Sequence, residues 1–125
     1  MAQNPDPQLQ LTSLRGATRT LDDWATVFKL AIVILPPRPE AKAFVPVVER
    51  IFATFADSDV RTCVCVPSTA AVAERIVGPL AQRYLVFCDP DNALATSLGL
   101  ERLPAFVHLR QDTSLVAAAQ GWSPT

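Results

Sequence analysis

Apolar residues along the chain occur either in short continuous runs or in stripes with helical spacing. The clearest run, Leu30–Leu35, is rich in β-branched residues and stops at Pro36, which is typical of a strand buried on both faces of a parallel sheet. The polar turn 110–113 separates two later apolar runs, which we therefore expect to be antiparallel. Besides Leu30–Leu35, we expect strands at 60–66, 84–88, 103–109 and 115–119.

Three helices are expected between these strands. Over 41–55, apolar residues recur at steps of three and four and form one stripe. Pro46 lies inside this stripe, so we expect the helix to kink there. Ser68 is expected to cap the second helix, and the Asp89 carboxylate the third, which should stop at Gly99.

The segment before the first buried strand is expected to form a short hairpin around Gly16. Strands that alternate with helices imply right-handed crossovers and a largely parallel sheet, to which the last pair adds an antiparallel part. We therefore predict an α/β fold with a mixed sheet flanked by helices. Residues 1–8 are expected to be a disordered tail, and 9–125 a single domain.

Composition and charge exclude several classes of function. The chain has 125 residues, 50% of them hydrophobic, which is enough for a core. Its net charge of −1 argues against a nucleic-acid partner, since such partners need clustered Lys and Arg. No apolar run approaches the roughly 18 residues that span a bilayer, so no membrane partner is expected. The polar amino terminus has no secretory pattern, which predicts a cytoplasmic protein.

The three cysteines, Cys63, Cys65 and Cys88, form no Cys-x-x-Cys pair, and their odd number does not suggest a disulfide framework. With only His108 to assist them, they do not make a conventional zinc site. No glycine-rich phosphate loop, serine nucleophile motif or paired carboxylates can be identified. We therefore predict no cofactor and no metal.

The order of elements resembles the thioredoxin-like fold, and three local features support the resemblance. The spacing from Lys42 to Pro46 is similar to that which follows the family's Cys-x-x-Cys motif after a buried strand. Leu103-Pro104 before a strand resembles the family's cis-proline segment, which implies a cis peptide bond there. Gly121 resembles a late glycine of the family.

One branch of the family is more similar than the others. The stretch 89–99 has the pattern Asp-Pro-x-x-x-x-Ala-x-x-x-Gly of peroxiredoxin-like (AhpC/TSA) and TlpA-like proteins. These proteins also carry an extra helix and strand between the halves of the fold, as 69–88 would. The resemblance covers roughly residues 9 to 122.

The chain departs from the family where its sulfur chemistry would lie. The resemblance places Arg38 and Ala41 at the positions of the two cysteines, and Ile32 at that of a buried acid. Thiol–disulfide exchange and peroxide reduction both need a thiolate at the start of this helix. We therefore predict a thioredoxin-like domain without the redox dithiol, which acts by binding.

The loop before this helix has two interpretations. In the first, the loop and the segment 103–104 form a groove that holds a protein or peptide partner by backbone pairing. The residues of this groove are Pro37, Arg38, Pro39, Glu40, Leu103 and Pro104. Alternatively, it is a stiff connector in which Glu40 favours the positive end of the helix. Arg38 is then either an anion contact or an exposed surface residue.

The cysteines also have two interpretations. Cys63 and Cys65 point to one face of a strand, where they either fill the core between valines or act as a redox sensor that exchanges with Cys88. Cys88 is expected to be more exposed, although Asp89 beside it would disfavour a thiolate. The alternative function is thus a thiol–disulfide oxidoreductase or peroxiredoxin-like antioxidant that uses a non-standard cysteine.

Thioredoxin-like domains usually finish with a helix that covers one face of the sheet. Ser123-Pro124-Thr125 resembles only the start of such a helix, so we expect the domain to lack it. The alternatives are a longer polypeptide and a partner that covers this face, which would favour a homodimer.

Overall fold

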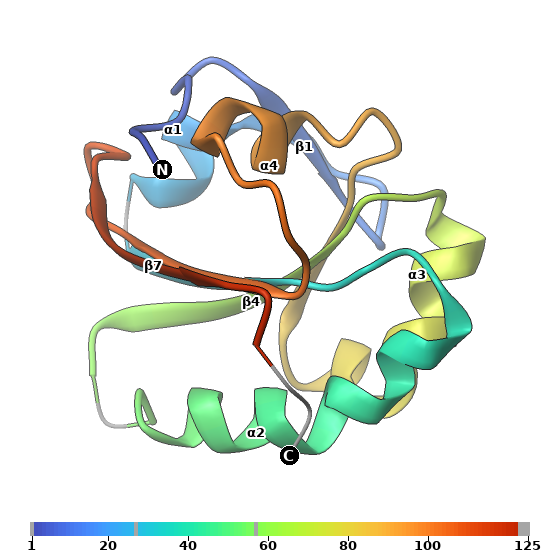
Figure 1. Ribbon diagram of the computed structural model, residues 1–125. Helices are drawn as coiled ribbons and strands as arrows, with labels where there is room; N and C mark the ends of the chain where they lie inside the picture. The colour runs from blue at the N-terminus through green and yellow to red at the C-terminus, as the bar shows by residue number, and fades with distance from the viewer. Residues whose placement is uncertain (1, 27, 57, 123–125) are drawn as a thin grey trace.

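The computed structural model describes residues 2–26, 28–56 and 58–122, which form one mixed sheet with helices on both sides (Figure 1). The strands are β1 (Gln10–Ser13), β2 (Thr18–Thr20), β3 (Lys29–Ile34), β4 (Val60–Val66), β5 (Leu85–Cys88), β6 (Ala105–Leu109) and β7 (Leu115–Gln120). The helices are α1 (Leu21–Ala25), α2 (Val45–Ala53), α3 (Ala70–Val77) and α4 (Ala93–Leu98), with 3₁₀ helices η1 (Pro39–Phe44) and η2 (Gly78–Gln82).

The sheet has seven strands in the order β2-β1-β5-β4-β3-β6-β7. Its three central strands, β5, β4 and β3, are parallel, as expected for strands joined by helical crossovers. The hairpin β1–β2 and the pair β6–β7 add antiparallel edges on either side. The predicted mixed α/β architecture is therefore confirmed.

The sheet separates two apolar layers. Leu30, Ile32 and Ile34 of β3 point into the first layer, which α1 and α4 cover. Val33 and Leu35 belong to the second layer, which α2 and α3 cover. This alternation confirms that the continuous apolar run is a strand buried on both faces.

Pro46 does not kink a long helix, so this prediction is wrong. It lies in the first turn of α2, and the preceding residues form the separate 3₁₀ helix η1. A proline is tolerated in a first turn because the N–H that it lacks would have no partner there. The apolar stripe over 41–55 thus belongs to two consecutive helices.

The caps of α3 and α4 agree in part with those predicted from the sequence. Thr69, and not Ser68, caps α3, and its side chain accepts a hydrogen bond from Val72 N at 3.4 Å. The N-cap residue of α4 is Asn92, not Asp89, but the buried Asp89 carboxylate does accept a hydrogen bond from Leu94 N in the first turn, at 2.9 Å. Gly99 ends α4 with a φ of 72°, in the left-handed region that favours glycine.

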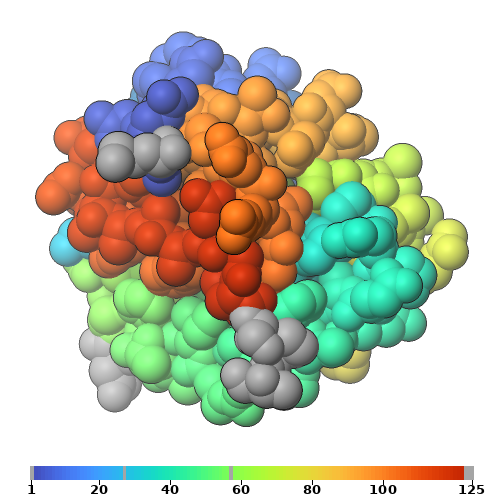
Figure 2. All heavy atoms as spheres, in the orientation of Figure 1, coloured from blue at the N-terminus to red at the C-terminus, as the bar shows by residue number. Residues whose placement is uncertain are grey.

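Residues 2–8 are not a disordered tail, and this expectation is corrected. Gln3 N donates to Leu98 O at 2.8 Å, and Asp6 N donates to the Ser97 hydroxyl at 2.6 Å. Pro5 is buried. The segment therefore lies against α4, as the space-filling view shows (Figure 2).

Two further expectations concern the ends and the membrane. The start of a carboxyl-terminal helix was expected at Ser123–Thr125, which lies outside the described residues. Within the described part of the chain, no helix is both long and apolar enough to cross a membrane.

Removal of residues 1–7 should lower the free energy of unfolding by about 2 kcal/mol, because several backbone hydrogen bonds and the buried Pro5 are lost. Urea unfolding followed by circular dichroism measures this. Equal stability of the shortened chain would show that the segment is a loose tail after all.

Candidate functional site

The candidate site lies where the carboxyl ends of β3 and β4 meet the start of β6. Ile34 pairs with Ala105, so the chain leaving β3 and the chain entering β6 run side by side. Leu35 N donates to Cys65 O at 2.9 Å, which holds the first of these segments against β4. Pro36 and Pro104 are buried beneath the site. The two segments that carry the predicted groove residues therefore start from paired strands at the same end of the sheet.

The loop after β3 presents charged side chains to solvent and leads directly into η1. Arg38 is exposed in an extended conformation, and its carbonyl accepts from Ala41 N at 2.9 Å. Pro37, Pro39 and Glu40 are exposed as well. Ala41 is fully buried in the second core layer. The start of this helix thus offers a guanidinium outside and a methyl group inside, and no sulfur.

The facing segment is held firmly by the end of β7. The Leu103–Pro104 peptide bond is cis, the geometry that the resemblance implied. Pro104 O accepts from Gly121 N at 2.8 Å, and Gln120 Oε1 accepts from Arg102 N at 3.1 Å. Gly121 has a φ of 69°, and a Cβ there would lie 3.0 Å from Arg102 Cδ. A glycine is therefore needed at this position.

Aromatic side chains support both ends of the sheet as packing anchors. Trp122 meets Phe44 of η1 edge-on, with ring centroids 5.4 Å apart. Trp24 packs in the same manner on Phe87 at 5.0 Å, and its indole N–H donates to Leu11 O. The contact between Trp122 and Phe44 holds η1 against the chain that follows β7.

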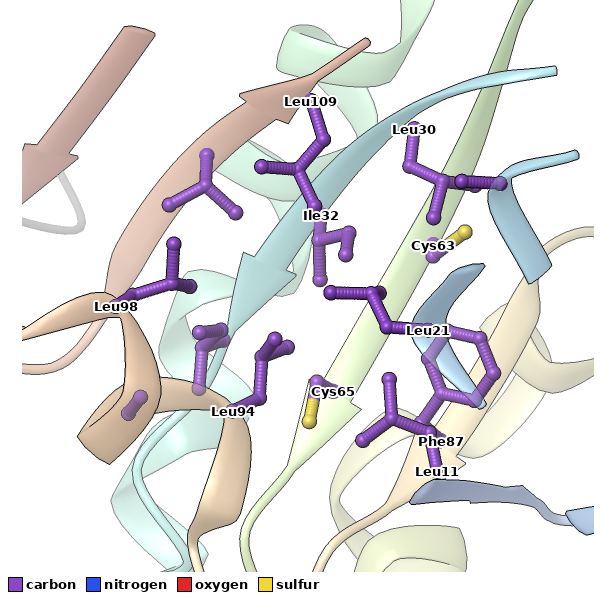
Figure 3. Packing of buried hydrophobic residues seen from close by; sticks show 14 residues of the cluster. Leu11, Leu21, Leu30, Ile32, Cys63, Cys65, Phe87, Leu94, Leu98 and Leu109 are labelled. Atoms are coloured by element: carbon purple, nitrogen blue, oxygen red, sulfur yellow. The ribbon is translucent and has the colours of Figure 1, made fainter. Parts of the chain in front are cut away.

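The three thiols lie inside the two core layers, and none of them belongs to the loop after β3. Cys63 and Cys65 are fully buried on the same face of β4, where Ile32 and Leu94 also lie (Figure 3). Cys88 belongs to the other layer and is 7% exposed, against 0% for Cys63 and Cys65, so it is the most exposed of the three thiols, as expected, although it too is buried. The sheet therefore lies between Cys88 and the other two thiols.

The environment of the paired thiols keeps them protonated. Burial raises the pKa of Cys63 to about 12, although the charge of Arg61 opposes this in part. Burial also raises the pKa of Cys65 well above its usual range, and the nearby Asp89 carboxylate adds to the effect. A thiol needs to ionise to act as a nucleophile, so these two side chains behave as core residues.

His108 lies on β6 and makes a packing contact. Its ring packs against Phe55 with centroids 5.7 Å apart. Burial, and then the charges of Lys29 and Arg110, lower the pKa of its imidazole. Within residues 2–26, 28–56 and 58–122, no group of three or more His, Cys, Asp or Glu side chains could hold a metal ion.

Comparisons with known proteins define the class of fold. No protein-family model and no curated protein matches the sequence. Among solved structures, MTB dsbF is 15% identical with a TM-score of 0.73, and the match covers 94% of this chain and 88% of that one. A secreted Mycobacterium tuberculosis disulfide oxidoreductase homologous to E. coli DsbE is 17% identical, with a TM-score of 0.70 and coverage of 93% and 85%. Peroxiredoxin Q of Xanthomonas campestris is 13% identical, with a TM-score of 0.72 and coverage of 90% and 80%.

The chain therefore has a thioredoxin-like fold, with structural neighbours among thiol–disulfide oxidoreductases and peroxiredoxins. At these identities the likeness concerns the fold. The seven-stranded sheet, the inserted α3 and β5, and the cis proline are the features through which the fold positions the site.

The stability of the protein should fall as the pH rises above 9. The ordinary pKa of the Cys63 thiol is 9.0 and its folded value is about 12, so the unfolded chain loses this proton first. Unfolding is then favoured by up to about 1.4 kcal/mol for each pH unit, for Cys63 and likewise for Cys65. Urea unfolding between pH 7 and 10 measures this slope.

The double variant Cys63→Ala, Cys65→Ala is the matched control for that experiment. It removes both thiols and leaves unchanged the other groups that lose a proton at high pH. Its free energy of unfolding should therefore depend less steeply on pH. Parallel curves for the two proteins would contradict the assignment of raised pKa values to these thiols.

Proposed function

We propose that this chain is a non-catalytic thioredoxin-like binding module whose partner is a protein or peptide. The observation that carries the proposal is the make-up of the loop after β3. It holds Arg38 and Ala41 where the resemblance places the redox cysteines, and it leaves β3 next to the strand that the cis Leu103–Pro104 bond precedes. The buried positions of the thiols support it, since none of them lies at the start of η1.

The loop is well suited to binding because little order has to be gained there. Three prolines at 36, 37 and 39 restrict its backbone, and a restricted loop loses less conformational entropy when a partner binds. Arg38 and Glu40 are both exposed and make no ion pair within the described residues. They offer charges of both signs to a partner.

Leu103 offers a second mode of contact. Within the part of the chain that the structure describes, its backbone N–H and C=O have no hydrogen-bond partner, and its side chain is half-buried. An extended peptide can pair with such backbone groups while its own side chains contact the loop. We therefore place the peptide between Leu103 and the residues Pro37–Glu40.

The alternative function is a thiol–disulfide oxidoreductase or peroxiredoxin-like antioxidant that uses a non-standard cysteine. The activities named for the structural neighbours favour it. Cys88 is the candidate thiol, because it is the least deeply buried of the three. Its sulfur donates to Thr12 O at 3.4 Å, so it would first have to leave this contact.

A redox assay separates the two functions. The natural chain should reduce neither insulin disulfides nor peroxide, whereas the double variant Arg38→Cys, Ala41→Cys should gain insulin reduction because it places two thiols at the start of η1. The single variant Arg38→Cys controls for one added thiol. Turnover by the natural chain that Cys88→Ser abolishes would instead establish the alternative function.

The binding proposal is tested with peptides selected from a random library displayed on phage. Arg38→Glu and Leu103→Asp should each weaken the selected peptides at least tenfold, because they remove a charge contact and an apolar contact. Arg75→Glu on α3, an equal charge change at an exposed residue, should bind as the natural chain does. Equal affinity in all four proteins would place the peptide elsewhere.

Cellular location and assembly stay predictions. The amino terminus predicted a cytoplasmic protein, whereas one structural neighbour is described as secreted. A homodimer is proposed only as an alternative to a longer polypeptide.

A further inference from the structure

A cavity lies at the opposite end of the sheet from the candidate site, by the amino-terminal ends of β4 and β5. It has a volume of about 470 Å³, within the range of small-molecule sites. Since β4 has seven residues, the cavity lies about 20 Å from the loop after β3. The lining residues used below are Arg15, Phe28, Asp59, Arg61, Arg83 and Tyr84.

The charges that line this cavity are mainly positive. Arg15 and Arg61 are exposed, and neither guanidinium has an ion pair or hydrogen bond within the described residues. Arg83 is already bound to Glu49, with 2.6 Å between Nη2 and Oε2. The acid in the lining, Asp59, is paired with Lys29 at 3.5 Å. Two guanidinium groups are thus left with unused donors, in a chain whose net charge is −1.

The cavity also contains aromatic surface. Phe28 is 40% exposed, which is unusual for a large apolar side chain in this structure. Tyr84 forms part of the wall, where its ring packs on Phe52 at 4.8 Å and under the Arg83 guanidinium at 5.3 Å. A planar apolar group can therefore be covered on one side while an anionic group faces the arginines.

We propose that this cavity binds a small aromatic anion, a ring that carries a phosphate or a carboxylate. Arg15, from the turn after β1, and Arg61, from the start of β4, bind the anionic group by charge-assisted hydrogen bonds. Phe28 contacts the ring. The site is independent of the peptide site at the other end of the sheet, so the protein has two ligand surfaces.

The test uses phenyl phosphate, with benzoate as the carboxylate probe, and follows backbone ¹H–¹⁵N chemical shifts of the full chain. We expect saturable shifts around residues 13–15, 58–62 and 82–86, and weaker binding as salt is raised. Arg15→Gln and Arg61→Gln should each raise the Kd at least tenfold. The matched control Arg75→Gln should leave it unchanged.

Two further comparisons separate the parts of the site. Phe28→Ala should weaken phenyl phosphate but leave the binding of inorganic phosphate as it was, because only the ring contact is lost. Arg38→Glu at the peptide site should leave phenyl phosphate unaffected, so the two proposals fail separately. The variants' spectra also show whether each is folded. Unchanged affinity in folded Arg15→Gln and Arg61→Gln would overturn the proposal.

Discussion

The structure depends on the burial of β3 on both of its faces. Ile32 and Val33, adjacent in the chain, enter different core layers, and both are completely buried. Burial of an aliphatic side chain of this kind contributes about 1.5–3 kcal/mol, so this strand is a large part of the stability. Because β4 pairs with it on one side and β6 on the other, its position also sets the position of both neighbours. The loop after β3 and the segment before β6 are therefore brought together by the core itself.

Much of the fold could be predicted because the signals for it are local. A continuous apolar run predicts a doubly buried strand, and Asp89 followed by an apolar helix predicts a cap. The resemblance assigns Arg38 and Ala41 to the positions of the family's cysteines, and in the structure these two residues lie at the start of η1. Pro46 was misjudged because an apolar stripe does not reveal where one helix ends and the next begins.

What could not be predicted depends on residues that are distant in sequence. The run Leu85–Cys88 is apolar throughout, so nothing in it shows which face Cys88 occupies; the pairing of Val66 with Cys88 decides this. The polar segment 2–8 is bound to α4, more than ninety residues away, and no local pattern indicates this. The arginine-lined cavity is built from separate strands, so its charges were scattered in the sequence.

The loop keeps its shape without any sulfur. A disulfide at the start of a helix would join two turns, whereas here the Arg38 carbonyl accepts from Ala41 N and the Ala41 methyl group is fixed in the core. On the other side, Gly121 N holds Pro104 O, so the facing segment is set by β7. Recognition of a partner's backbone would use backbone N–H and C=O groups, whereas attack by a thiolate needs a sulfur atom, so the two use different atoms. In the proposed function, the first uses the backbone groups of Leu103 and therefore does not require the second.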